Sequence, residues 1–158
     1  SVPMGQPVFC IDVECVATSV QHTGRAVAQI AMVNEWGQAI FSVMVKPDVP
    51  ICSYITPLTG LTKEKIDEHG MSMTEALAVL KNHLPPNAIL AGQNILKDML
   101  WLNLKEGEDY ASLIDLSALF QVWNTKHNAM TGFGQDHCAR VWLGIQDRES
   151  HDKSKHKV

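Results

Sequence analysis

Residues 7–15 (PVFCIDVEC) form a nearly continuous apolar run that only two carboxylates, Asp12 and Glu14, interrupt. A short run of this kind is typical of a strand that is buried on both faces in the centre of a sheet. Residues two positions apart in a strand point to the same face. The sequence therefore predicts a central strand that holds two carboxylates side by side.

Two adjacent carboxylates in an apolar strand are costly, because like charges repel and both groups lose hydration. A divalent cation removes both costs, and Mg²⁺ and Mn²⁺ bind carboxylate and water oxygens. The alternative is an edge strand whose acidic side chains face water. The apolar residues on either side of Asp12 and Glu14 favour the metal site.

The rest of the chain alternates between strand and helix patterns. Strands are predicted at 26–34 and 38–45, which a turn joins as a hairpin, and at 88–91 and 113–116. Helices are predicted at 62–68, at 72–84 with a capping box of Ser72 and Glu75, and at 92–104, 116–123 and 133–143.

This order of elements predicts a mixed sheet flanked by helices in an α/β domain. We expect residues 1–158 to form one domain, whose last segment, 147–158, is an atypical polar tail. The final helix that should pack on the sheet is missing from this pattern.

Composition narrows the classes of function. The formal net charge of −4 counts against a module that binds nucleic acid through a broad basic surface, and less against an enzyme whose metal ions neutralise phosphate. The four cysteines show no zinc-ligand spacing and are expected to be free thiols in a reducing compartment. Without a secretory signal or a run of about 18 apolar residues, we expect an intracellular protein of the nucleus or cytoplasm that does not enter a membrane.

Other polar residues are weaker candidates when taken alone. Asn94 and Asp98 lie four positions apart, on one face of a predicted helix, but an aspartate beside Lys97 is more typical of a solvated surface. His151 is one of seven histidines and stands in the polar tail. Asp115, in the predicted strand at 113–116, is expected to be structural.

Taken together, these segments resemble the DEDD family of 3′→5′ exonucleases in its DEDDh subgroup, and in particular the RNA exonuclease branch that includes the interferon-stimulated exonuclease. FCIDVEC is similar to the first family motif, GQNILKDMLWL to the second, and LGIQDRESHD to the approach to the third. ITPLTGL is similar to the substrate-side loop, and LIDL to the strand after the second motif. The resemblance covers nearly the whole chain and implies an RNase H-like fold.

The resemblance implies an enzyme that removes nucleotides from the 3′ ends of single-stranded RNA or DNA with two Mg²⁺ or Mn²⁺ ions. It implies that Asp12 bridges both ions, that Glu14 completes the first site and that Asp98 supports the second. His151 would be the general base, a task that suits imidazole. The residues implied to contact the substrate are Val16, Ala17, Thr18, Leu61 and Asn94.

One position departs from the family pattern, because His156 stands where the fourth carboxylate is expected. Histidine supplies no negative charge toward Mg²⁺, and the tail lacks the apolar spacing of a closing helix. We therefore expect weak metal binding and reduced activity, and we expect that the natural C-terminus has been lost or replaced. The alternatives are a degenerate exonuclease domain that binds nucleic-acid ends or a protein partner, and an RNase H-like endonuclease or proofreading module.

Overall fold

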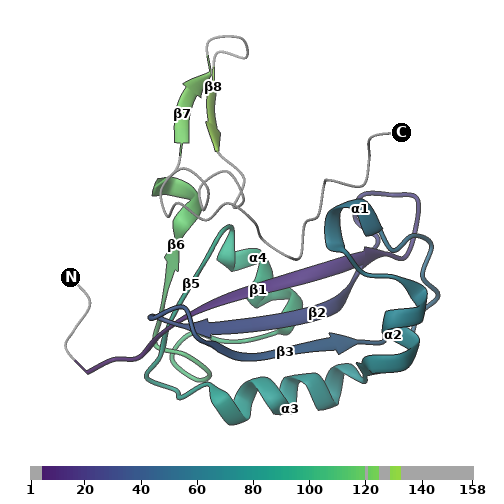
Figure 1. The fold of residues 1–158 in the computed structure, drawn as a ribbon. Coiled ribbons are helices and arrows are strands. Elements are labelled where there is room, and N and C mark those ends of the chain that lie inside the picture. Colours follow the sequence, from purple (N-terminus) through teal and green to yellow (C-terminus); the bar gives the residue numbers. More distant parts are fainter. Residues whose placement is uncertain (1–4, 120, 125–128, 133–158) are drawn as a thin grey trace.

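The structure is a computed structural model that describes residues 5–119, 121–124 and 129–132, with side chains up to residue 117. A six-stranded mixed sheet has the strand order β4-β3-β2-β1-β5-β6, and β7 and β8 form a separate two-stranded sheet (Figure 1). The strands are β1 (Val8–Ala17), β2 (Arg25–Asn34), β3 (Ala39–Val45), β4 (Gly70–Met71), β5 (Ile89–Gly92), β6 (Ser112–Asp115), β7 (Gln121–Asn124) and β8 (Ala129–Gly132). The helices are α1 (Thr56–Thr59), α2 (Lys63–His69), α3 (Met73–His83), α4 (Ile95–Leu102) and the 3₁₀ helix η1 (Leu116–Leu119).

Strand β1 lies inside the sheet, because it pairs antiparallel with β2 and parallel with β5. The prediction of a central strand is confirmed, and the edge-strand alternative is wrong. Burial alternates in the middle of β1, where Ile11 and Val13 are buried while Asp12 and Glu14 are half-buried. The expected burial on both faces is therefore wrong at this point, since the face that carries the carboxylates is partly open.

Strand β1 also extends beyond its neighbour β5. The parallel pairing joins residues 8–10 to residues 89–91, so the part of β1 that carries Asp12 and Glu14 lies past the carboxyl end of β5. Ligand sites of open α/β sheets lie outside the carboxyl ends of the parallel strands. The topology thus places both carboxylates where a site is expected.

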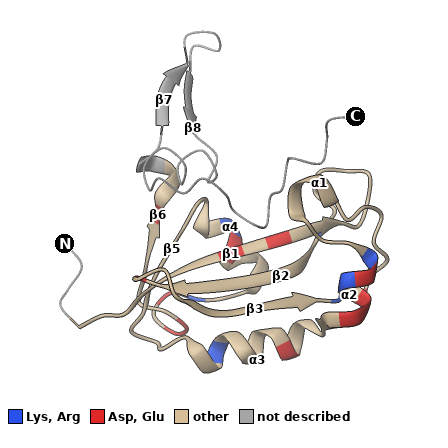
Figure 2. Cartoon of the chain, in the orientation of Figure 1, with Lys and Arg blue, Asp and Glu red and all other residues tan. Residues whose placement is uncertain are grey.

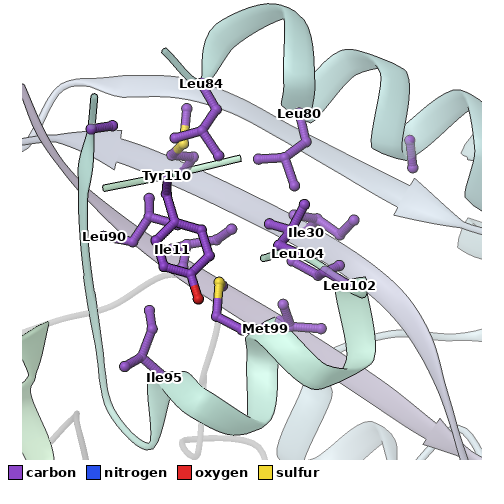
Figure 3. Close-up of a cluster of buried hydrophobic side chains, with 14 of the residues drawn as sticks. Ile11, Ile30, Leu80, Leu84, Leu90, Ile95, Met99, Leu102, Leu104 and Tyr110 are labelled. Atoms are coloured by element: carbon purple, nitrogen blue, oxygen red, sulfur yellow. The ribbon is translucent and has the colours of Figure 1, made fainter. Parts of the chain in front are cut away.

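The main hydrophobic core lies between the sheet and the helices α3 and α4 (Figure 3). Ile11 and Ile30 of the sheet, Leu80 of α3 and Met99 of α4 meet there, and each is at most 2% exposed. Burial of such side chains is the main stabilising term in a domain of this size. The core therefore fixes α4 against β1, which is the contact that the candidate site needs.

The N-terminal caps of α2 and α3 are as predicted. The side chain of Thr62 accepts a hydrogen bond from the N–H of Lys65 at the start of α2, and Ser72 and Glu75 form the predicted capping box of α3. These side chains satisfy backbone N–H groups that have no partner within the helix. Helix α1 was not predicted; it is a single turn between Ile55 and Gly60, which both have left-handed backbone angles.

Helix α4 is shorter than predicted. Gly92 was expected to open it, but Gly92 is the last residue of β5, and α4 begins only at Ile95. Asn94 and Asn103, with φ values of 55° and 51°, flank the helix in the left-handed region, which a right-handed helix cannot include. A Cβ on Gly92 would lie 3.0 Å from the carbonyl oxygen of Ile11, so glycine lets the chain pass close to β1 before the helix starts.

The helix predicted through Trp123 is wrong. After β6 the chain makes the short 3₁₀ helix η1, and residues 121–124 then form β7, which pairs antiparallel with β8. Valine and tryptophan at positions 122 and 123 favour strands, and pairing with β8 overrides the weak helical pattern. The helix predicted at 133–143, the polar tail, His151 and His156 lie outside the described residues. Within the described part of the chain, no helix is long and apolar enough to cross a membrane.

Candidate nuclease site

The first motif places two carboxylates on one face of β1, as predicted. Asp12 lies opposite Ala31 and Glu14 opposite Gln29 on β2, and the register between the two strands shifts directly after Glu14. Irregularities of this kind are frequent next to active sites, where they change the direction of a strand. The half-buried side chains of Asp12 and Glu14 thus lie beside an irregularity in the pairing of β1 with β2.

The second motif brings Asp98 to the same place. Asp98 lies in the first turn of α4 and is only 6% exposed. Burial, and then the negative charges of Asp12 and Glu14, raise the pKa of Asp98 to about 7. The acidic positions of β1 and α4 accordingly lie beside each other in Figure 2. The structure therefore brings together Asp12, Glu14 and Asp98, which are far apart in the sequence.

This group of carboxylates fits a divalent cation. Burial and the neighbouring carboxylates both raise the pKa of Asp98, and Mg²⁺ or Mn²⁺, which bind carboxylate oxygens, would favour its ionised form. Over the described residues, however, no three His, Cys, Asp or Glu side chains are already arranged around one ion position. The donor set fits the metal, but its ligand geometry is not preformed.

Asp115, whose expected role is structural, also lies near this group of carboxylates. Asp115 ends β6, and the oxygen Oδ1 of its side chain accepts hydrogen bonds from the N–H of Asn94 at 3.2 Å, the N–H of Ser117 at 2.9 Å and the hydroxyl of Ser117 at 2.6 Å. Its negative charge also contributes to the raised pKa of Asp98. An aspartate at the carboxyl end of a strand beside the site, followed two residues later by serine, was the sequence signal available for this role.

The residues expected to contact substrate differ in exposure. Val16, Ala17 and Leu61 are buried, with exposures of 0%, 7% and 2%, whereas Thr18 is half-buried and Asn94 is exposed. Val16 and Leu61 pack in a second hydrophobic cluster. Substrate contact by these five residues stays a prediction, and the burial of Val16, Ala17 and Leu61 directs attention to their exposed neighbours.

Backbone hydrogen bonds fix the chain after the first motif. The N–H of Ala17 donates to the carbonyl oxygen of Ser53 at 2.8 Å, and the carbonyl of Ala17 accepts from Cys52 at 2.7 Å. The N–H of Thr18 donates to the carbonyl of Gly24 at 3.0 Å. The end of β1 is therefore tied to the segment that leads into α1, beside the carboxylates.

Comparison with known proteins identifies the family of this chain. No family model matches the chain. RNA exonuclease 5 of Bos taurus is 32% identical over 120 residues, which are 76% of this chain and 14% of that protein. The chain thus spans about a seventh of the length of this relative, a protein much larger than the matched region.

Solved structures agree on the fold. The Pan2 module of Saccharomyces cerevisiae, described as a pseudoubiquitin hydrolase-RNA exonuclease, has a TM-score of 0.69 at 14% identity over 95% of this chain and 26% of that one. E. coli Exonuclease I in complex with a dT13 oligonucleotide has a TM-score of 0.66 at 17% identity over 93% of this chain and 38% of that one. The predicted resemblance is confirmed: this chain is a homologue of the RNA exonucleases and has the mixed α/β, RNase H-like fold of the DEDD exonucleases.

Proposed function

We propose that this chain is a metal-dependent 3′→5′ exonuclease domain that hydrolyses single-stranded RNA, or DNA, from the 3′ end. The observation that carries the proposal is the buried carboxylate of Asp98, whose pKa rises to about 7 beside Asp12 and Glu14. The homology of the chain to RNA exonuclease 5 supports RNA as the substrate. The oligonucleotide complex of Exonuclease I, which shares the fold, supports a single strand.

Each carboxylate has a proposed role at two Mg²⁺ or Mn²⁺ ions. Asp12 would contact both ions, Glu14 would complete the first site and Asp98 the second. The bound ions would supply Lewis-acid activation of the attacking water and stabilisation of the leaving 3′-oxygen. Because β1 and α4 are regular elements packed against the main core, their backbones are fixed, and the three carboxylate side chains would adjust around the ions.

The terminal base would be held by an exposed apolar residue of α1. Leu61 was expected to stack on the base, but it is 2% exposed, whereas Leu58 of α1 is 62% exposed. We assign the stacking contact to Leu58 and the support of its loop to Leu61, since apolar walls bind bases without regard to sequence. Thr18 and Asn94 would supply polar contacts to the sugar and phosphate, and Val16 and Ala17 would shape the floor of the site.

His151 is the proposed general base, and the histidine at position 156 is the reason to expect low turnover. The family pattern would place a carboxylate there, and imidazole cannot replace its charge toward Mg²⁺. The second candidate function, a domain that binds nucleic-acid 3′ ends without cleaving them, rests on this same substitution. The two functions differ in whether the phosphodiester bond is broken.

The test uses 5′-labelled single-stranded RNA and, separately, DNA, each with Mg²⁺ or Mn²⁺. The wild-type chain should produce a ladder of one-nucleotide steps, and Asp12→Asn should abolish it. Asp67→Asn is the matched control, because it removes one carboxylate from α2, where Asp67 pairs with Lys46 and is not among the charges that shift the pKa of Asp98. Binding of the labelled RNA without any ladder, even with His156→Asp, would leave the binding domain as the function.

A further inference from the structure

We propose that Asp115 is a positioning residue of this site, which fixes the start of α4 and thereby the place of Asp98. This inference deepens the proposed function and rests on it for the effect on metal binding. The observation that carries it is the convergence of three hydrogen bonds on the single oxygen Oδ1 of Asp115, one of them from the backbone that leads into α4.

Asp115 stands where two chain segments leave the sheet. It is the last residue of β6 and lies opposite Gly92, the last residue of β5. The chain after β5 turns into α4, and the chain after β6 turns into η1 (Figure 1). By accepting from Asn94 on one segment and from Ser117 on the other, the side chain of Asp115 joins both exits at the edge where the carboxylates lie.

The start of α4 needs such a contact. Asn94 has left-handed backbone angles and makes no side-chain capping bond to the helix, so the geometry of this turn is not fixed by a conventional cap. Helix α4 has eight residues, and a helix this short depends on contacts outside itself for its position. The hydrogen bond from the N–H of Asn94 to Asp115 is such a contact, directly before the helix.

A shift at Asn94 is transmitted to Asp98, because only one helical turn separates them. Asp98 is buried beside Asp12 and Glu14, and a small displacement of its carboxylate changes the distances to any shared cation. Residues that orient metal ligands without touching the metal commonly change metal affinity about 10- to 100-fold when they are removed. Asp115 would act in this way, through Asn94 and the first turn of α4.

Two substitutions distinguish a role for the hydrogen bonds of Asp115 from a role for its negative charge. All three hydrogen bonds end on one oxygen, and the side-chain carbonyl of asparagine offers an equivalent acceptor. Asp115→Asn therefore keeps the acceptor and loses the charge, whereas Asp115→Ala loses both. A residue that acts through its hydrogen bonds is restored by asparagine, and a residue that acts as an anion is not.

The matched control is Asp109→Ala. Asp109 also accepts a backbone N–H, from Lys105 at 2.9 Å, and also contacts a side chain, Lys81 at 3.0 Å. The backbone group that Asp109 holds, at Lys105, follows α4, whereas the one that Asp115 holds, at Asn94, precedes it. Asp109→Ala therefore shows the effect of losing an aspartate that makes similar contacts but does not bind Asn94.

Two measurements on the whole chain decide the proposal. The first is amide hydrogen exchange of residues 94–98 in metal-free protein, and the second is the affinity for Mn²⁺ by titration calorimetry. Asp115→Ala should speed the exchange and weaken Mn²⁺ binding by about 10-fold or more. Asp115→Asn should stay within about 3-fold of wild type in both, and Asp109→Ala should leave both unchanged. Ser117→Ala removes one of the three donors and should produce a smaller shift in the same direction, which keeps the test open if the alanine at 115 does not fold.

Two results would overturn the proposal. Unchanged exchange at residues 94–98 in both Asp115→Ala and Ser117→Ala would mean that Asp115 does not hold the start of α4. Weak Mn²⁺ binding in Asp115→Asn with normal exchange would mean that Asp115 acts through its charge. If wild type itself does not bind Mn²⁺, the proposed function fails, and the exchange data still decide whether Asp115 positions α4.

Discussion

Two aspartates on short helices of this domain have opposite electrostatic surroundings. Asp67 of α2 contacts Lys46 at 2.8 Å and also Lys63, and these partners hold its pKa down at about 2. Burial, and then the charges of Asp12 and Glu14, raise the pKa of Asp98 of α4 to about 7. The first aspartate has its counter-charges built into the chain, whereas the second lacks enough of them. The difference supports the proposed cation site beside Asp98.

The largest expected effect of this difference is on catalysis. Asp98→Ala should lower the rate of Mg²⁺-dependent RNA cleavage by about 100-fold or more, because a transition-state charge loses its cation support. Asp67→Ala should leave the rate within about 2-fold of wild type, as expected for a surface position. Single-turnover cleavage of 5′-labelled RNA measures both. Equal losses in the two variants would remove the functional distinction between the two aspartates.

The next effect is on stability with added metal. Mn²⁺ at about 100 times its dissociation constant should stabilise the folded wild-type chain by about 2.7 kcal/mol, and thermal unfolding with and without Mn²⁺ measures this. Asp98→Asn should lose most of the increase, because one ligand and one charge are gone. Asp67→Asn should keep it. A full increase in Asp98→Asn would place the ion elsewhere.

The metal-free protein should show a pH dependence that has its origin in Asp98. A carboxyl whose pKa is about 4 when unfolded and about 7 when folded stabilises the folded state below pH 4, and this stability is lost as the pH rises through 7. The loss amounts to at most about 4 kcal/mol, at about 1.4 kcal/mol for each pKa unit. In chelator, Asp98→Asn should therefore unfold at a higher temperature than wild type at pH 8 and at a similar temperature at pH 4. Parallel pH profiles for the two proteins would mean that Asp98 does not cause the loss of stability at high pH.

The smallest effect is expected at Asp67, with the opposite sign. Its lowered pKa means that the ionised form stabilises the fold above pH 4 and that this contribution is lost as the pH falls through 2. Because the group is exposed to solvent, the change should be small and should shrink in 1 M salt. Urea unfolding of Asp67→Asn and wild type at pH 6, at low and high salt, measures it. A difference that does not respond to salt would assign the effect to packing.

The sequence predicted the elements whose signals are local. The capping box of Ser72 and Glu75 and the cap at Thr62 were read from residue spacing, and the structure contains both. The carboxylates of β1 were placed on one face from the two-residue repeat of a strand alone. In these cases the physical cause and the sequence signal lie within a few residues of each other.

Other features depend on contacts between distant segments and could not be predicted in this way. Asp98 looks like a surface residue in its own helix, and only the packing of α4 on β1 makes it 6% exposed. The late start of α4 follows from the close approach of Gly92 to Ile11, and Asp115 acquires its role from its pairing across to β5. The strand at 121–124 needs its partner β8 to outweigh a helical pattern. The family resemblance, rather than the residue pattern, identified Asp98 as a candidate.

The pairing of β1 with β5 joins residues about eighty positions apart, with Val8 opposite Ile89. Closing so long a stretch of chain costs entropy before any contact is gained, and such pairings form late in folding. Asp98 follows β5 in the chain, so a nascent chain emerging from the ribosome exposes Asp12 and Glu14 long before their third partner exists. The proposed metal site should therefore be incomplete during synthesis of the chain, and the onset of Mn²⁺ binding should coincide with the last, slowest step of refolding.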